Sequence, residues 1–230
     1  MSTTSRVAGT VCLQGGAEFG PDCRDMDAEL LRRADGPVVV SALAGTPGSD
    51  YRTATENGVR HFRSLGATDV VAAPDAREDR AAALAALSRA RLVVLPGGSP
   101  SRLLHALTST GVDEALHELL AAGGVLSGSS AGAMVLGGWT VLPEGGARVE
   151  RGLGVVPDLL VVPHWTGDRP DWTAAVEAVV PPDVTVLGIP EQSGVLVEGD
   201  LLTAVGSGST TLVRSGAELA PGQTANRSTT

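Results

Sequence analysis

Residues 125–134 read Val-Leu-Ser-Gly-Ser-Ser-Ala-Gly-Ala-Met and contain a G-x-S-x-G motif centred on Ser130. Apolar residues precede the motif, and small residues compatible with a helix follow it. This order is typical of a nucleophile elbow, a sharp strand-to-helix turn that exposes a serine hydroxyl. A side chain at Gly128 or Gly132 would clash in so tight a turn. The stretch therefore predicts a strand, the elbow and a helix, and it indicates a serine hydrolase.

The chain on both sides of this motif alternates between strand-like and helix-like segments. We expect strands at residues 7–13, 38–43, 69–73, 92–95 and 125–127, and helices at residues 25–33, 49–65, 77–89, 101–107 and 112–121. All-apolar strands such as Leu-Val-Val-Leu at 92–95 are typical of parallel strands buried on both faces. The alternation predicts an α/β three-layer sandwich with a mainly parallel central sheet.

The sequence changes character after Gly137. Residues 139–163 are rich in β-formers, and residues 171–180 predict a further helix. The last strand-like segments, which we expect to form a closing meander, are 184–189, 194–197 and 201–205. No repeat or linker divides the chain, so residues 1–230 are expected to be a single hydrolase domain with its core at 7–213. The polar composition of residues 217–230 predicts a frayed tail.

Composition and charge narrow the range of partners. The net charge is −9 and only six residues are aromatic, which disfavours nucleic acid and an anionic membrane surface as partners. All seventeen basic residues are arginine, which excludes Schiff-base and Walker-A chemistry because both need lysine. Residues 1–10 lack the apolar stretch of a signal peptide, and no run is long enough for a membrane span, so we expect a cytoplasmic protein.

Two cysteines and two glycine-rich turns bear on possible cofactors. Cys12 and Cys23 are too few for a disulfide scaffold or a metal site, and we expect them to be reduced, inert thiols. The turns at 14–20 and 96–100 fit no phosphate-binding motif, so we expect neither cofactor nor metal. Both turns follow strands, as the elbow does. Because ligands bind beyond the carboxyl ends of strands in such sheets, the three should be neighbours.

Histidine is the residue most suited to take a proton from a serine hydroxyl near neutral pH. His164 ends the strand-like segment Leu-Leu-Val-Val-Pro and begins a loop, which places an imidazole at the carboxyl edge of a strand. His61 and His117 lie within amphipathic helices, where surface or boundary roles are expected. His105, on a short helix after a glycine turn, is a minor alternative. The sequence therefore favours His164 as the base.

A histidine base needs a carboxylate to orient it and to stabilise the imidazolium. In the order serine, acid, histidine, the candidates are Glu144, Glu150 and Asp158. In the order serine, histidine, acid, the candidate is Glu191, which follows the apolar segment 184–189. Both orders remain open from the residues alone.

Taken together, these segments resemble a known family. The motifs are Leu-Gln-Gly-Gly-Ala-Glu at 13–18, Leu-Pro-Gly-Gly at 95–98, Ser-Ser-Ala-Gly-Ala at 129–133, Gly-Leu-Gly at 152–154, Pro-His-Trp at 163–165 and Gly-Ile-Pro-Glu at 188–191. The chain resembles the cyanophycinase and dipeptidase E family of serine peptidases over residues 7–213. The resemblance implies a class I glutamine amidotransferase-like fold, and it makes a homodimer plausible.

The resemblance also implies roles for individual residues. Cyanophycinase-like members have a Ser–His–Glu triad, which makes Ser130 the nucleophile, His164 the base and Glu191 the acid. Dipeptidase E draws its acid from the loop after the elbow, which would point to Glu144, and we prefer Glu191. The resemblance places the oxyanion hole, which stabilises the tetrahedral intermediate, at the main-chain N–H of Ala131 and at a second N–H on the turn of Gly97 and Gly98.

The chain departs from cyanophycinase where the substrate would bind. Family members usually carry Asp-Gln after the glycine pair and before the histidine, but this chain has Ser99-Pro100 and Val162-Pro163. Proline cannot supply the side-chain contacts of glutamine, so degradation of cyanophycin itself is doubtful. The remaining candidates for substrate contacts are Ser99, Trp165, Arg169 and Glu18. Trp165 would line the pocket or fill the core, and Arg169 would bind a substrate carboxylate or be an ordinary surface arginine. For Glu18, contact with a substrate amine is the less favoured role.

These observations predict a metal-independent serine hydrolase that cleaves amide bonds, peptide or isopeptide, of a small substrate through an acyl-enzyme. Two alternatives use the same fold. One is a serine-dependent amidase or acyltransferase acting on a specialised metabolite. The other is a non-catalytic binding protein, which the presence of Ser130, His164 and Glu191 together disfavours.

Overall fold

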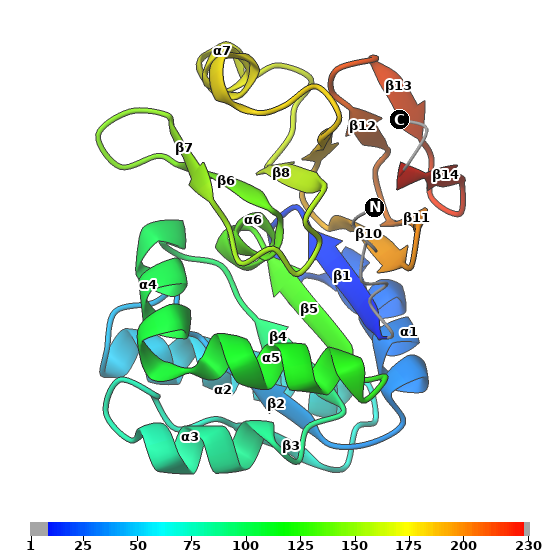
Figure 1. Ribbon diagram of the computed structural model, residues 1–230. Helices are drawn as coiled ribbons and strands as arrows, with labels where there is room; N and C mark the ends of the chain where they lie inside the picture. The colour runs from blue at the N-terminus through cyan, green and yellow to red at the C-terminus, as the bar shows by residue number, and fades with distance from the viewer. Residues whose placement is uncertain (1–8, 228–230) are drawn as a thin grey trace.

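An eight-stranded sheet runs through the protein and carries helices on both faces (Figure 1). The computed structural model describes residues 9–227. In spatial order the strands are β14 (Thr224–Asn226), β11 (Leu201–Gly206), β10 (Ser193–Glu198), β1 (Thr10–Gln14), β5 (Val125–Ser129), β4 (Leu92–Leu95), β2 (Val38–Val40) and β3 (Val70–Ala72). The run from β1 to β3 is parallel, and β10, β11 and β14 are antiparallel additions.

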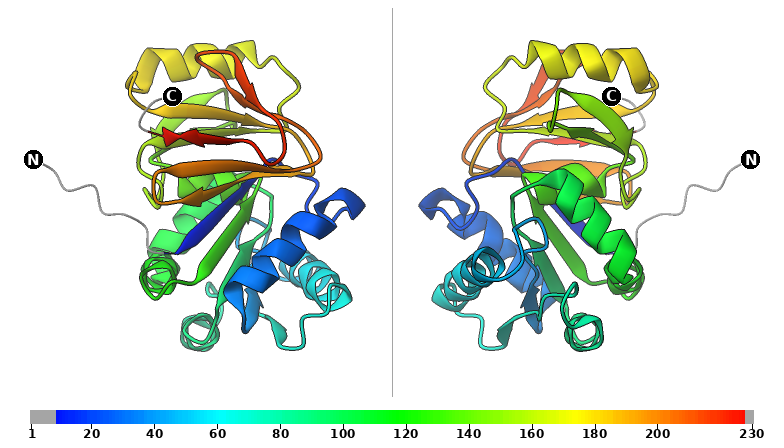
Figure 2. Two further views of the ribbon diagram at one scale, coloured as in Figure 1. Left: turned by 90° about the vertical axis from the view of Figure 1, so that its right-hand side faces the viewer. Right: turned by 90° about the vertical axis from the view of Figure 1, so that its left-hand side faces the viewer.

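The helices form the two outer layers of the sandwich (Figure 2). One face is covered by α1 (Arg24–Ala34), which follows the short 3-10 helix η1 (Pro21–Cys23), and by α2 (Ser49–Ser64). The other face is covered by α3 (Arg80–Leu87), α4 (Pro100–Thr110), α5 (Val112–Ala121) and α6 (Ala131–Leu136). In β4, Leu92 and Val94 pack toward α1 and α2, whereas Val93 and Leu95 pack toward the opposite helices. The all-apolar strand is thus buried on both faces, as predicted.

A second sheet lies beyond the carboxyl ends of the parallel strands (Figure 1). Its strands are β13 (Ala217–Leu219), β12 (Thr210–Leu212), β9 (Thr185–Ile189) and β8 (Leu159–Pro163), in that order. A hairpin of β6 (Trp139–Leu142) and β7 (Arg148–Arg151) and the helix α7 (Pro170–Val179) accompany it. Met134 of α6 packs with Leu160 and Val186 of this sheet, so the elbow helix contributes to the cores of both sheets.

The predicted closing meander over 184–189, 194–197 and 201–205 is wrong. The first segment is β9, which pairs in parallel with β8 in the second sheet. The other two are β10 and β11, which extend the large sheet: β10 pairs antiparallel with β1, and β11 pairs antiparallel with β10. The turn at residues 190–192 carries the chain from one sheet to the other. Apolar strand patterns predict that a segment is buried, but not which strand becomes its partner.

The predicted frayed tail over 217–230 is also wrong for the residues that the structure describes. Residues 217–219 and 224–226 form β13 and β14, and β14 pairs with β11. Arg227 is buried, and its guanidinium forms ion pairs with Asp158 and Asp200. Main-chain pairing and a buried arginine hold this segment despite its polar side chains. Residues 228–230, and residues 7 and 8 of the predicted core, lie outside the described residues.

Within residues 9–227, no helix is long and apolar enough to cross a membrane. The cytoplasmic location, the single-domain organisation and the homodimer stay predictions.

Truncating Arg227 should destabilise the fold. Arg227→Ala removes the cation that joins the start of β8 to the turn between β10 and β11, and we expect the free energy of unfolding to fall by about 1–3 kcal/mol. Urea denaturation followed by circular dichroism measures this. Arg89→Ala, at an exposed arginine, is the matched control and should change stability by less than about 0.5 kcal/mol. Equal stability of the two variants would contradict the role of Arg227.

Candidate active site

Ser130 occupies a strained turn between β5 and α6. Its φ is +49° and its ψ is −111°, a backbone conformation that residues other than glycine rarely adopt. A Cβ on Gly128 would lie 2.5 Å from the Gly132 carbonyl carbon, and one on Gly132 would lie 2.2 Å from the Leu95 oxygen. The turn therefore needs both glycines, as the motif predicts. This is the geometry of a nucleophile elbow.

The structure brings Ser130, His164 and Glu191 together. His164 follows β8 and Glu191 follows β9, so the parallel pairing of these strands places the two side chains side by side. Ser130 Oγ lies 2.8 Å from His164 Nε2, and His164 Nδ1 lies 3.1 Å from Glu191 Oε1. With its proton on Nδ1, the imidazole donates to Glu191 and accepts from the Ser130 hydroxyl through Nε2.

Glu144, the alternative acid, has other partners. It lies in the turn of the β6–β7 hairpin and accepts hydrogen bonds from Ser99 Oγ and Ser101 Oγ, each at 2.7 Å. Partial burial raises the pKa of the Glu144 carboxyl, but the bonds from Ser101 and Ser99 leave it below its usual value. Glu144 thus ties the hairpin to the start of α4, whereas the carboxylate beside His164 is that of Glu191.

The other three histidines lie elsewhere. His105 and His117 are exposed on α4 and α5. His61 is buried, contrary to the surface or boundary role expected for it, and its Nε2 lies 2.8 Å from Asp27 Oδ2. The α2 face that carries His61 packs on the sheet, and the Asp27 carboxylate on α1 gives the buried imidazole a hydrogen-bond partner.

The predicted oxyanion turn follows β4. The Gly97 N–H donates to Glu18 Oε1 over 2.7 Å, and the Ser99 N–H donates to the Ala44 carbonyl over 3.0 Å. Gly98, between them, has a φ of +144°. Ala131 is the first residue of α6, where a helix leaves its N–H groups without intrahelical acceptors. Gly97 therefore has a side-chain partner within the protein, which leaves Gly98 and Ala131 as the candidate oxyanion donors.

Comparison with known proteins identifies the family. The model of peptidase family S51 matches residues 43–205. The chain belongs to peptidase family S51. It is 30% identical over 223 residues to a cyanophycinase of Synechococcus elongatus, covering 89% of this chain and 68% of that protein. It is 27% identical over 228 residues to a cyanophycinase of Trichormus variabilis, covering 93% of this chain and 76% of that protein.

Solved structures show the same fold. A peptidase from an acI-B1 Actinobacterium superposes with a TM-score of 0.81 at 22% identity, covering 95% of this chain and 96% of that chain. A protein described as peptidase E from Listeria monocytogenes EGD-e gives a TM-score of 0.66 at 20% identity, covering 87% and 99% of the two chains. The predicted class I glutamine amidotransferase-like fold is confirmed, and the protein is a serine peptidase that hydrolyses amide bonds.

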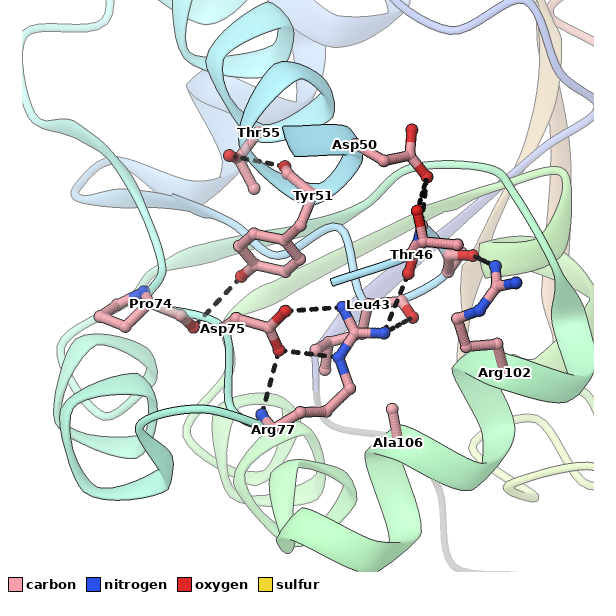
Figure 3. Close-up of polar contacts among 12 residues, drawn as sticks. Leu43, Thr46, Asp50, Tyr51, Thr55, Pro74, Asp75, Arg77, Arg102 and Ala106 are labelled. Atoms are coloured by element: carbon pink, nitrogen blue, oxygen red, sulfur yellow. Dashed lines mark hydrogen bonds and ion pairs between the residues drawn. The ribbon is translucent and has the colours of Figure 1, made fainter. Parts of the chain in front are cut away.

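Further polar contacts hold the loop against which the predicted oxyanion turn of this S51 peptidase packs (Figure 3). Arg77 donates to both oxygens of Asp75, over 2.8 and 2.7 Å, and to the carbonyls of Leu43 and Gly45. Arg102 donates to the Ala44 carbonyl over 2.7 Å, the same oxygen that accepts the Ser99 N–H. Two arginines thus fix the loop after β2, against which the glycine turn packs.

The predicted substrate residues have contacts within the protein. Trp165 donates from Nε1 to Thr211 Oγ1 over 3.0 Å, and its ring lies 2.5 Å from the Cβ position of Gly188 on β9. It therefore packs on the second sheet rather than lying free beside the serine. Arg169 stacks over the Trp172 ring, 4.8 Å from its centroid. Ser99 caps α4 by accepting from the Arg102 N–H over 3.2 Å.

Sequence reasoning missed a buried polar cluster under the site. Gln14 donates from Nε2 to Asp27 Oδ1 over 2.8 Å and to Ser127 Oγ over 3.3 Å, and all three residues are buried. The signal was present, because Gln14 ends an apolar strand and Asp27 shares a helix face with Met26 and Leu30. The main-chain carbonyl of Gln14 accepts the Ser130 N–H over 3.0 Å, so this cluster supports the elbow.

The two thiols should be inert in the native protein. Cys12 and Cys23 are free and buried. Burial raises the pKa of the Cys23 thiol to about 11 and raises the pKa of Cys12 well above its usual value. Because the thiolate is the reactive form, Ellman's reagent at pH 8 should titrate neither thiol before denaturation and both in guanidinium. Rapid reaction of either native thiol would contradict this.

Proposed function

We propose that Ser130, His164 and Glu191 form a catalytic triad that cleaves the amide bond of a small peptide or isopeptide through an acyl-enzyme. The single observation that carries this proposal is the 2.8 Å contact between Ser130 Oγ and His164 Nε2 at a strained elbow. A serine hydroxyl needs such a base to become a nucleophile at neutral pH. The 3.1 Å contact between His164 and Glu191 supports the acid's role.

The reaction follows from the positions of these groups. Ser130 Oγ attacks the amide carbon while His164 Nε2 takes the hydroxyl proton, and Glu191 stabilises the resulting imidazolium through Nδ1–H. The N–H groups of Gly98 and Ala131 stabilise the oxyanion. The imidazolium then protonates the leaving nitrogen, the C–N bond breaks, and the amine departs. Water that gives its proton to His164 next attacks the acyl carbon, releasing the acid and restoring the Ser130 hydroxyl.

The substrate that we propose is a small peptide other than cyanophycin. The relatives are cyanophycinases, and this chain has Ser99-Pro100 and Val162-Pro163 at the positions where the family resemblance leads us to expect Asp-Gln pairs. Ser99 is bonded to Glu144 and caps α4, so it is already engaged within the protein. The exposed fractions of the His164 and Glu191 side chains, 39% and 59%, support a site open to short substrates.

A serine-directed probe tests the nucleophile. Wild-type protein treated with a fluorophosphonate should gain one adduct in intact mass, because His164 activates Ser130, and Ser130→Ala should gain none. Ser109→Ala, which removes an exposed hydroxyl on α4, is the matched control and should still be labelled. Absence of an adduct on the wild type, or an adduct on Ser130→Ala, would refute the assignment.

Paired substitutions test the acid. Glu191→Gln should lower the rate of labelling by the same probe about 100-fold or more, because the imidazolium loses its carboxylate partner. Glu144→Gln should lower it by less than about tenfold, because the amide still bonds to Ser99 or Ser101. The reverse ranking of the two variants would identify Glu144 as the acid.

A further inference from the structure

Glu18 lies in the turn after β1, beside the serine. Its neighbours Ala17 and Phe19 have φ values of +50° and +65°, conformations that only a constrained turn imposes on residues with side chains. A Cβ on Gly97 would meet Glu18 Oε1 and Ser130 Cβ, each at 3.2 Å. The strained turn thus carries a carboxylate to a position next to the nucleophile.

Both carboxylate oxygens of Glu18 have donors within the protein. Oε1 accepts the Gly97 N–H over 2.7 Å, and Oε2 accepts the Ser129 hydroxyl over 2.9 Å. These donors come from the turn after β4 and from the end of β5, and Glu18 itself follows β1. One carboxylate therefore links three adjacent strands where they reach the active site. Hydrogen bonds to an ionised acceptor are short and strong, which suits this role.

The contact with Gly97 has a consequence for the oxyanion hole. A peptide N–H that donates to Glu18 points toward β1, so it cannot also serve the oxyanion. Fixing that peptide plane restricts the orientation of the next one, whose N–H belongs to Gly98. The Ser99 N–H is held on the other side by the Ala44 carbonyl. Gly98 therefore lies between two anchored peptides.

We propose that Glu18 is a positioning residue that orients the Gly98 N–H toward the oxyanion, and that it does not bind substrate. The inference rests on the proposed function of Ser130. Glu18 acts through the reach of its side chain, because it must span from the β1 turn to Gly97 and Ser129 together. A role in binding a substrate amine would instead depend on its charge and would leave the carboxylate oxygens open for that amine.

Three substitutions separate reach from charge. Glu18→Gln keeps the length and an acceptor oxygen but loses the charge, whereas Glu18→Asp keeps the charge but is one methylene shorter. Glu18→Ala loses both. Glu118→Ala, an exposed glutamate on α5, is the control for truncation. Each purified variant is reacted with a fluorophosphonate probe that carries no amine, and the maximal labelling rate and the half-saturating probe concentration are measured alongside the melting temperature.

Positioning predicts a loss of maximal rate with little change in half-saturation. Glu18→Asp and Glu18→Ala should label about 100-fold more slowly than wild type, the cost of losing one oxyanion donor. Glu18→Gln should label within about tenfold of the wild-type rate, because it keeps the length and an acceptor oxygen. The remaining loss is expected because a neutral amide oxygen is a weaker acceptor than a carboxylate. Melting temperatures close to wild type for Glu18→Asp and Glu18→Gln show that the comparison concerns folded protein.

Two outcomes would overturn the proposal. Wild-type rates in all three variants would mean that Glu18 does not orient the oxyanion turn. A slow Glu18→Gln beside a fast Glu18→Asp would mean that the charge matters rather than the reach. Failure of the wild type itself to be labelled would refute the proposed function instead, so the two failures are distinguishable.

Discussion

Three successive main-chain carbonyls at the end of β1 hold the parts of the active site together. Those of residues 14, 15 and 16 accept the N–H groups of Ser130, His164 and Gln192 over 3.0, 2.9 and 2.9 Å. The three donors come from different segments: the elbow, the end of β8 and the turn after β9. Because β1 lies at the centre of the large sheet, these bonds fix the second sheet to the first at the proposed active site.

The same three donors carry backbone strain. Ser130, His164 and Gln192 have φ values of +49°, +51° and +53°, and each such residue costs on the order of 1–3 kcal/mol. A strained conformation persists only where its surroundings over-determine it, and here the β1 carbonyls and the buried strands do so. Gly16 completes the fit, since a Cβ at that position would lie 2.3 Å from the His164 ring. Strain and close contact thus coincide at the proposed active site, around the end of β1.

Local features of the sequence predicted most of the fold and picked out candidate site residues that the structure brings together. The elbow glycines, the apolar strands and the ends of α5 at residues 112–121 follow from turn chemistry and periodicity. His164 and Glu191 are candidates because each follows an apolar segment, but only the family resemblance favours Glu191 over Glu144. Partners distant in sequence were not predictable: β9 and β10 enter different sheets, and Glu18 meets Gly97 across 79 positions. The buried pair of His61 and Asp27 was missed because each lies on a helix whose composition looks amphipathic.

The most direct measurement is a crystal structure of the wild-type protein after reaction with a fluorophosphonate. We expect phosphorus bonded to Ser130 Oγ, with the phosphoryl oxygen about 3 Å from the N–H groups of Gly98 and Ala131. We also expect the Gly97 N–H still to donate to Glu18. Phosphorus on any other residue, or a phosphoryl oxygen bound to the Gly97 N–H with Glu18 displaced, would contradict these expectations.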